Sequence, residues 1–398
     1  MAVSDVTCYV TNSHFSVIAR GYTKRSGIMS RNLLFTVAVI LFCLLMLPAA
    51  GFAQNLPLGE AAPAGGNVLG LGHLGRHIGD IERIIHFYHD VLGMDIQGQR
   101  NAPRPFFTTP GLRDFANTPD YADFRAVILP IPGTAAGGKG QAVTVEAIEF
   151  RNMNRRQFVQ GIQDIGSSRL ILFLRDLDKA LEKLKAEGVV IVTDGGTPVE
   201  VTSRYGSGKK ERAIVVRDPD GYPVELVQLD VLPKTTAPAD GNIIGARVSL
   251  TVEDLEASEK LYTALVGPEL KFRNRSSFVK DEACNKLWNT PGAEFRYTAA
   301  LVPGSPVYME FIQFRGVRQE KQDTILQDIS TAHFLFTAED AEIALSRVKA
   351  AGLKTVATSG GYVHIGPTAP ALFVKEINNF FIEFIARSPV QNVPAKAK

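Results

Sequence analysis

Four times along the chain, an extended apolar stretch runs into an aspartate and then into a segment with helical spacing of its apolar residues. The aspartates are Asp80, Asp176, Asp254 and Asp340. Aspartate is a favourable N-cap, because its carboxylate accepts hydrogen bonds from the free amides of the first helical turn. Behind the first two caps the apolar residues recur every three or four positions, at Ile81, Ile84, Ile85 and Tyr88 and again at Leu177, Leu181 and Leu184. We therefore predict a helix after each aspartate.

The segments around these helices read as strands. Gly188 and Gly352 are predicted to end the second and fourth helices as left-handed caps. Two or three strand-like stretches follow each helix, and the last one is apolar with an embedded glutamate, as Glu225 in DPDGYPVELVQ (218–228). The repeating unit is therefore predicted to be strand–helix–strand–strand–strand, present four times.

The two halves of the chain repeat each other. Residues 79–96 match 253–270, residues 117–133 parallel 289–304, and residues 175–189 match 339–353. These matches indicate a duplication of about 170 residues. We expect one domain of two units at 68–230 and a second at 243–387, joined by a Pro- and Ala-rich linker at 231–242.

The N-terminal region has the pattern of a targeting segment. Residues 29–53 combine a short basic start, an apolar run at 33–47 and small residues before Gln54, which is typical of a signal peptide. The apolar run is shorter than the roughly 20 residues that span a bilayer. We expect translation to begin at Met29, cleavage after Ala53, export to the periplasm or medium, and no membrane partner after cleavage.

Charge and cysteine content narrow the classes of function. The chain has 43 basic and 41 acidic residues, so it offers no basic surface for nucleic acid. Three cysteines are present, and Cys284 alone follows the predicted signal peptide. The exported chain would then have no internal disulfide, and its core must supply the stability.

Two segments carry a family resemblance: GHLGRHIGDIERIIHFYHDVLGM (72–94) and RDPDGYPVELVQL (217–229). Over about residues 68–387 the chain resembles the vicinal oxygen chelate superfamily of glyoxalase I, bleomycin resistance proteins and extradiol dioxygenases. The resemblance implies an α+β fold in which four βαβββ units pair into two cup-shaped, eight-stranded mixed sheets. It also implies a small-molecule ligand in a cup.

In that superfamily the metal ligands come from the first strand (usually His) and the last strand (usually Glu) of each unit. Here the first-strand positions are His73, Arg169, Arg247 and His333, and the last-strand positions are Glu146, Glu225, Glu310 and Glu383. If units adjacent in sequence pair, one cup holds His73, Glu146, Arg169 and Glu225, and the other holds Arg247, Glu310, His333 and Glu383. The resemblance then implies a divalent ion (Fe, Mn, Zn or Ni) on these histidines and glutamates, with Glu225 and Glu383 as catalytic residues.

The two arginines depart from the superfamily pattern. Arginine cannot coordinate a metal, because it offers only donors and stays protonated. One interpretation is a pair of buried ion pairs, Arg169 with Glu225 and Arg247 with Glu310. In a second interpretation, Arg169 and Arg247 bind an acidic group of a substrate. His77 shares a strand face with His73 but lies roughly 13 Å from it, too far for a shared ion, and the loop position of His364 cannot be fixed.

Other motifs are weaker. GLGHLG (70–75) has the GxGxxG form of a dinucleotide loop, but the helix begins only at Asp80, so we do not expect a nucleotide site. His86 and His89 are expected on a solvated helix face. Trp288 is expected either near a cup or in the core.

Three functions follow from these observations. The first is a metal-dependent lyase, isomerase or dioxygenase, in which the ion polarises vicinal oxygen atoms of the substrate and a glutamate acts as base. The second is a metal-free protein that binds and sequesters a small molecule, as bleomycin resistance proteins do. The third is an exported protein whose cups serve only as a scaffold.

Overall fold

The computed structural model describes residues 10–11, 14–15, 66–108, 111–136, 141–202, 210–273, 275–364 and 369–387. The chain divides into two units, Met1–Phe52 and Ala53–Lys398. In the first, β1 (Val10–Thr11) pairs antiparallel with β2 (His14–Phe15). The predicted signal peptide, 29–53, lies outside the described residues, so export stays a prediction. Among the described residues, no helix has the length and apolar character needed to cross a membrane.

Helices begin at all four predicted aspartates. They are α2 (Ile81–Ile85), which continues as the π-helical segment η1 (His86–Val91), α4 (Leu177–Ala186), α5 (Leu255–Val266) and α7 (Ala341–Ala350). Each aspartate side chain accepts a hydrogen bond from an amide of the first turn, for example Asp254 from Ala257 at 2.7 Å. Gly188 and Gly352 follow α4 and α7 with φ of +66° and +74°, the left-handed conformation that glycine adopts without strain. The predicted caps are confirmed.

The four units do not all contain the predicted four strands. The second holds β6 (Ser168–Leu174), β7 (Val199–Thr202), β8 (Lys210–Arg217) and β9 (Pro223–Leu229), with a 3₁₀ turn, η3 (Asp194–Gly196), before β7. The fourth holds β13 (Ala332–Ala338), β14 (Val363–His364), β15 (Pro370–Lys375) and β16 (Phe381–Ala386). In both, three strands follow the helix, as predicted.

In the first and third units the described residues form only two strands after the helix. These are β3 (Val68–Ile78), β4 (Asp123–Pro130) and β5 (Thr144–Arg151) in the first unit, and β10 (Ile243–Thr251), β11 (Glu294–Leu301) and β12 (Tyr308–Arg315) in the third. A short helix precedes each final strand pair: α3 (Leu112–Ala116) and α6 (Glu282–Trp288). Isolated bridges, Phe107 to Phe124 and Arg273 to Ala299, join the segment before each short helix to the strand after it.

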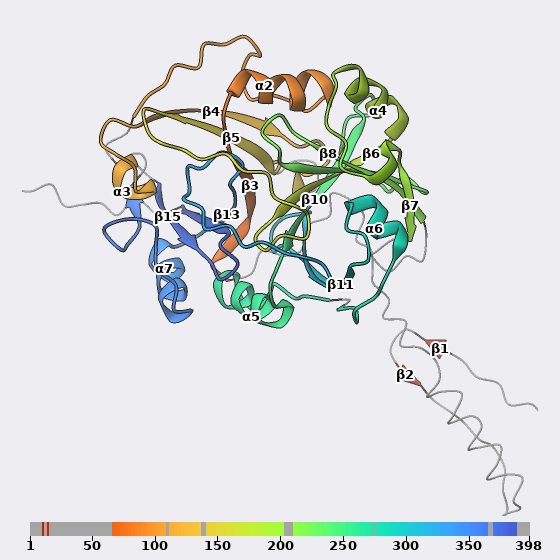
Figure 1. The fold of residues 1–398 in the computed structure, drawn as a ribbon. Helices are drawn as coiled ribbons and strands as arrows, with labels where there is room; N and C mark the ends of the chain where they lie inside the picture. Colours follow the sequence, from red (N-terminus) through yellow and green to blue (C-terminus); the bar gives the residue numbers. More distant parts are fainter. Residues whose placement is uncertain are drawn as a thin grey trace, which may run out of the picture. The chain divides into compact units, whose positions relative to one another are not determined.

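The strands form two seven-stranded mixed sheets instead of the predicted eight-stranded ones (Figure 1). We call them the β3 sheet, in the order β14-β15-β16-β13-β3-β5-β4, and the β6 sheet, in the order β11-β12-β10-β6-β9-β8-β7. The first unit therefore pairs with the fourth, through antiparallel β3 and β13, and the second pairs with the third, through β6 and β10. The expectation that the first unit pairs with the second, and the third with the fourth, is wrong. The domain boundaries at 68–230 and 243–387 stay predictions.

The first and second units contact each other through buried polar groups instead. Arg76, on β3, is fully buried, and its Nη2 lies 3.2 Å from Asp218 Oδ2 in the turn before β9. The hydroxyl of Tyr88 donates to the same carboxylate oxygen at 3.2 Å, and the Arg76 guanidinium lies 3.4 Å over the ring of Tyr222. The DPDG turn therefore accepts a charged side chain from the other sheet.

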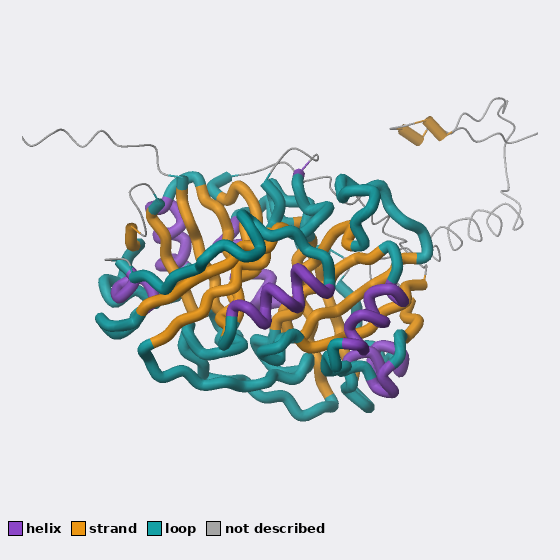
Figure 2. Tube along the Cα trace, turned by 90° about the horizontal axis from the view of Figure 1, so that it is seen from above, coloured by secondary structure: helices purple, strands orange, loops and turns teal. Residues whose placement is uncertain are grey.

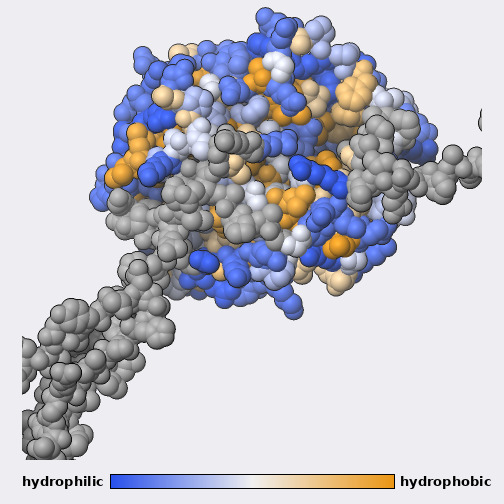
Figure 3. All heavy atoms as spheres, turned by 180° about the vertical axis from the view of Figure 1, so that it is seen from behind, coloured by the Kyte–Doolittle hydropathy of each residue, from blue (hydrophilic) through white to orange (hydrophobic). Residues whose placement is uncertain are grey.

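The helices cover the sheets with their apolar sides, and polar residues dominate the outside. Figure 2 shows helices lying against strands. Buried side chains from them, including Ile81, Leu177, Leu255 and Ala341, belong to one hydrophobic cluster with residues of both sheets. The face in Figure 3 is largely hydrophilic with scattered hydrophobic residues. Burial of this cluster is the main source of stability of the fold.

Candidate metal centre

Strand register brings two histidines and two glutamates to one face of the β3 sheet. His333 on β13 lies opposite Gly75 on β3, and Gly75 lies opposite Glu146 on β5. In the next row, His73 lies opposite Leu335, and Leu335 lies opposite Glu383 on β16. Paired residues, and residues two apart on a strand, share a face of the sheet. The two central strands thus carry the histidines and the two flanking strands carry the glutamates.

The four side chains converge closely. His73 Nε2 lies 3.1 Å from His333 Nε2, 3.0 Å from Glu146 Oε2 and 3.3 Å from Glu383 Oε2. His333 Nε2 lies 3.1 Å from Glu383 Oε2. One ligand atom from each of the four residues lies within 4.8 Å of the others. We call this group, His73, Glu146, His333 and Glu383, the His–Glu cluster.

A glycine makes room for the cluster. A Cβ built on Gly75 would lie 1.9 to 2.4 Å from three atoms of the His333 ring, far inside contact distance. His333 is fully buried and its ring also packs edge-on to Phe373, so it has no free space to retreat into. The absence of a side chain at position 75 therefore lets the His333 ring lie beside His73.

Burial and charge oppose each other in the cluster. Burial penalises the charged form of His73, but Glu146 and Glu383 outweigh it, so the pKa of His73 is raised. Burial also disfavours ionised Glu383, yet hydrogen bonds from His333 and His73 lower its pKa to about 2. The pKa of His333 is lowered, chiefly by burial. Without a metal, the cluster therefore holds ionised Glu383 between a readily protonated His73 and a neutral His333.

The β6 sheet presents the same register with different residues. Arg169 lies opposite Ser249, and Ser249 lies opposite Glu310; Ile171 lies opposite both Arg247 and Glu225. Arg169 Nε lies 3.1 Å from Glu225 Oε2, and its Nη2 lies 3.4 Å from Glu310 Oε1. The guanidinium of Arg169 therefore neutralises both glutamates. Arg169 holds the register position in the β6 sheet that His333 holds in the β3 sheet.

The model of the Glyoxalase/Bleomycin resistance protein/Dioxygenase superfamily matches residues 70–226. The matched part of the chain belongs to this superfamily. The match begins in β3 and ends in β9, and it contains His73, Glu146, Arg169 and Glu225.

Superfamily relatives with curated names include two proteins of Arabidopsis thaliana. "Probable lactoylglutathione lyase, chloroplastic" is 23% identical over 234 residues, which are 59% of this chain and 50% of the relative. "Lactoylglutathione lyase GLX1" is 24% identical over 198 residues, 50% of this chain and 54% of the relative. The chain spans about half the length of the curated relatives it matches.

Solved structures with a similar course of the chain include glyoxalase I from Zea mays and a putative dioxygenase from Bacillus subtilis. The first has a TM-score of 0.48 at 17% identity and covers 80% of this chain and 92% of that one. The second has a TM-score of 0.47 at 14% identity and covers 82% of this chain and 87% of that one.

The donor set of the His–Glu cluster fits a divalent metal. Nitrogen and oxygen ligands lie about 2.1 Å from zinc, so neighbouring ligands of one ion lie roughly 3 Å apart. The four contacts within the cluster measure 3.0 to 3.3 Å. Two imidazoles and two carboxylates also suit first-row divalent ions. The cluster is therefore compatible with a divalent ion in this superfamily protein.

The structure separates the residues predicted from the sequence into two groups. It brings together His73, Glu146, His333 and Glu383, which had been assigned to different cups. It places Glu225 and Glu310, proposed as metal ligands, and Arg169, proposed to bind substrate, in the buried ion-pair group of the β6 sheet. The predicted pairing of Arg169 with Glu225 is confirmed. Arg247 lies in the same sheet, with its guanidinium 4.9 Å from the centre of the Phe173 ring.

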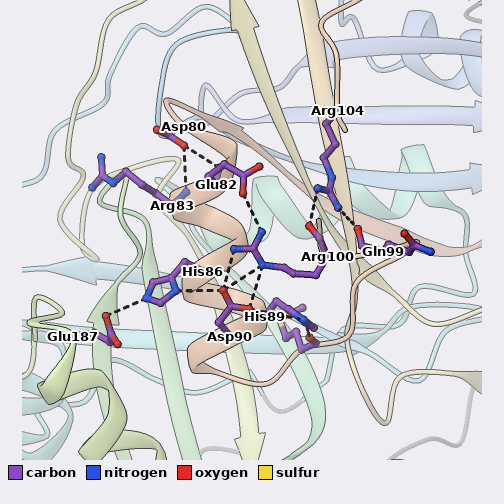
Figure 4. A network of polar contacts seen from close by, with 11 residues as sticks. Asp80, Glu82, Arg83, His86, His89, Asp90, Gln99, Arg100, Arg104 and Glu187 are labelled. Atoms are coloured by element: carbon purple, nitrogen blue, oxygen red, sulfur yellow. Dashed lines mark hydrogen bonds and ion pairs between the residues drawn. The ribbon is translucent and has the colours of Figure 1, made fainter. Parts of the chain in front are cut away.

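The remaining histidines lie outside the cluster. His77 is buried beside His333, and His364 is exposed on β14. His86 and His89 lie on the polar side of η1, as expected: Figure 4 shows His86 between Asp90, at 3.3 Å, and Glu187, at 3.0 Å. Trp288 is buried, and its Nε1 donates to Glu225 at 3.2 Å.

Sequence reasoning missed Gly75 as a residue of the site. The glycines of GLGHLG (70–75) match a nucleotide-binding motif, but Gly75 instead makes room for the His333 ring on the neighbouring strand β13. A clue was present in its position, two residues after His73 and two before His77 on the same strand face. Gly75 belongs to the site only because β13 lies next to β3, and the sequence alone does not reveal this strand order.

Proposed function

We propose that the chain is a divalent-metal-dependent lyase or isomerase that acts on a small molecule with neighbouring oxygen atoms. The observation that carries this proposal is the convergence of His73, Glu146, His333 and Glu383 on one face of the β3 sheet. When bound, a divalent ion such as Zn, Ni, Mn or Fe polarises substrate oxygen as a Lewis acid and so acidifies the adjacent carbon.

The two glutamates differ in a way that assigns them different roles. Glu383 contacts both imidazoles and is almost fully buried, which suits a permanent ligand. Glu146 contacts His73 at 3.0 Å, and 23% of its side chain is exposed. A carboxylate that accepts a proton from a substrate needs access to it. We assign Glu146 as the general base, and Glu383, His73 and His333 as the residues that hold the ion.

The number of carboxylates favours a lyase or isomerase over a dioxygenase. Non-haem iron oxygenases use two histidines and one carboxylate, and leave the other positions open for oxygen and substrate. Here two carboxylates approach His73, and the second provides a base where an oxygenase keeps a vacant position. The names of the matched relatives, which are lactoylglutathione lyases, agree with this choice.

A cleft borders the same face of the sheet. It has a volume of about 400 Å³ and is lined by residues including Leu326, Lys354, Lys375 and Phe381. Phe381 lies opposite His333 in the parallel pair β13–β16, so both side chains point to one face. The volume suits a small organic molecule. The cleft therefore offers room for a small molecule beside the strand pair that carries His333, although no residue of the His–Glu cluster lines it.

One substitution tests whether Glu146 acts as the general base or as a metal ligand. Glu146→Gln removes the basic oxygen but keeps a similar shape. With lactoylglutathione as the first substrate, the variant should lose at least about 100-fold in kcat, the range for a general base, while it keeps its bound metal. Glu200→Gln, at an exposed position of β7, is the matched control and should behave as wild type.

Several outcomes would contradict the proposal. Metal-loaded protein that turns over neither lactoylglutathione nor other α-oxygenated thioesters, but consumes oxygen with a catechol, would replace the lyase with a dioxygenase. Metal-free protein that binds a small molecule tightly and without turnover would favour sequestration. Unchanged kcat in Glu146→Gln would remove Glu146 from the role of base.

A further inference from the structure

His77 lies behind the His–Glu cluster and is not one of its ligands. It follows Gly75 by two residues on β3, so it points to the same face as His73. Its side chain is 1% exposed, and its ring centre lies 5.3 Å from that of His333. His333 therefore lies between His73 on one side and His77 on the other.

The contacts of His77 fix which of its nitrogens carries the proton. Its Nδ1 is in hydrogen-bond contact with the carbonyl oxygen of Leu326, which can only accept. The hydroxyl of Thr331 also lies 2.9 Å from Nδ1, but it has two carbonyl oxygens to donate to, at 2.6 and 2.7 Å. Nδ1 is thus the donor, which leaves Nε2 of the neutral ring as an acceptor. That Nε2 is buried and has no hydrogen-bond partner among the described residues.

His333 presents the complementary atom. Its Nε2 faces His73 and Glu383, so Nε2 is the nitrogen that would bind an ion. An imidazole that binds a metal through one nitrogen carries its proton on the other, and usually donates it to an outer-shell acceptor. In His333 that other nitrogen, Nδ1, is buried and also lacks a hydrogen-bond partner within the described part of the chain.

The separation of the two rings suits a hydrogen bond between them. The rings of His73 and His333 have centres 5.2 Å apart, and their nearest nitrogens are 3.1 Å apart. The rings of His77 and His333 have centres 5.3 Å apart, nearly the same separation. A buried donor and a buried acceptor that both lack partners are costly unless they meet.

We propose that His77 is a positioning residue, which accepts a hydrogen bond from His333 Nδ1–H and so holds His333 Nε2 free for a metal. The resulting chain runs from the Leu326 carbonyl through His77 to His333. This inference rests on the proposed function, because it concerns the metal-binding form of His333.

Two substitutions of His77 separate positioning from simple packing. An asparagine amide reaches the place of Nδ1, so His77→Asn keeps the contact with Leu326 but lacks an acceptor towards His333. A glutamine amide reaches the place of Nε2, so His77→Gln keeps the acceptor and gives up the contact with Leu326. We expect the Asn variant to bind Zn²⁺ about 10- to 100-fold more weakly than wild type, and the Gln variant to bind within about threefold of wild type.

Competition with a chromophoric chelator measures the affinities, and thermal unfolding checks that each variant folds. If His77 only packs against Leu326, the order reverses and the Gln variant is the weaker one, which would overturn the inference. Wild type that binds no divalent ion would instead overturn the proposed function. Equal affinity of wild type and the Asn variant would overturn the inference alone.

A spectroscopic readout on wild type avoids any dependence on folding of variants. In zinc-loaded protein with ¹⁵N-labelled histidine, long-range proton–nitrogen correlations report the tautomer of each ring. We expect His333 to carry its proton on Nδ1 and His77 to carry its proton on Nδ1 with an accepting Nε2. A His77 ring protonated on Nε2 would exclude the hydrogen bond.

Discussion

The His333 ring occupies the space that a side chain at position 75 would fill. Gly75 lies opposite His333 in the antiparallel pair of β3 and β13, and a Cβ there would come within 1.9 Å of the ring. A single missing side chain on one strand therefore determines where a candidate ligand from another strand can lie. This relationship joins residues 258 positions apart in the sequence.

Replacement of Gly75 by alanine should disrupt metal binding. The added methyl group must push the buried His333 ring away from His73, which removes one ligand from the cluster. We expect Zn²⁺ affinity to fall by more than roughly 100-fold, beyond the usual outer-shell effect. Gly361→Ala is the control, because a Cβ there meets no atom within 4 Å. If Gly75→Ala binds zinc as wild type does, His333 is not a ligand.

Metal binding should weaken as the pH falls, and more strongly than for an ordinary imidazole. The carboxylates of Glu146 and Glu383 raise the pKa of His73 above 6.5 despite the opposing effect of burial. A metal must displace this proton, so binding should release close to one proton per ion below that pKa and fewer above it. Calorimetry in buffers of different ionisation enthalpy measures the release.

His86 provides a control for this pH profile. Contacts with Glu187 and Asp90 raise the pKa of His86 as well, but its side chain is exposed and these two partners lie outside the His–Glu cluster. His86→Ala should leave the proton release unchanged. A release that vanishes in this variant, or that stays constant across pH, would contradict the assignment of His73.

Loss of Arg169 should destabilise the fold. Its guanidinium lies between the buried carboxylates of Glu225 and Glu310, and Arg169→Met would leave both without it. Removing one partner of a buried ion pair typically costs about 3 to 5 kcal/mol. Urea unfolding measures the loss. Arg212→Met, which breaks an exposed pair with Asp178, should change stability little; equal effects of the two variants would contradict the role of Arg169.

Glu376 should make stability depend on pH near neutrality. It is buried in the turn that corresponds to the DPDG turn, but Leu250 stands where the other half of the chain has Arg76. Burial raises its pKa to about 7, against hydrogen bonds from Asn378 and Phe380 that lower it. The folded form therefore holds a proton that the unfolded chain releases above about pH 4.5.

The sign of this effect follows from the raised pKa. The contribution is fully present below about pH 4.5 and is lost as the pH rises towards 7, by about 3 kcal/mol in all. Glu376→Gln should remove this pH dependence and stabilise the protein at pH 8. Thermal unfolding of wild type and variant between pH 4.5 and 8 tests it; parallel curves would show that Glu376 is ionised when folded.

Much of the fold can be read from the sequence because it is local. The aspartate caps, the glycine ends of α4 and α7, and the glutamates of the last strands depend on short-range rules of hydrogen bonding and periodicity. The four first-strand positions lie seven residues before the capping aspartates, and the four glutamates are embedded in the apolar last strands. The loss of a strand from the first and third units was not predictable, because Phe107 and Arg273 retain strand-like contacts without forming a ladder.

The candidate site depends on long-range pairing, which the sequence does not specify. The first and fourth units each supply one histidine at the ligand position. If each is paired with the arginine-bearing unit next to it, either sheet has too few ligands to bind a metal. Pairing β3 with β13 gives both histidines to one sheet and both arginines to the other. The charges agree with this arrangement, since both arginines lie in the sheet without the His–Glu cluster, and the guanidinium of Arg169 lies next to two carboxylates there.

The central claim is that one sheet of the two binds a metal, and metal content tests it most directly. Protein exchanged with excess Zn²⁺ and separated from free ion by gel filtration should contain one zinc per chain by elemental analysis. His333→Ala should contain none, whereas His364→Ala, which removes an exposed histidine from the same sheet, should still contain one. Wild type without zinc, or His333→Ala with a full ion, would contradict the account.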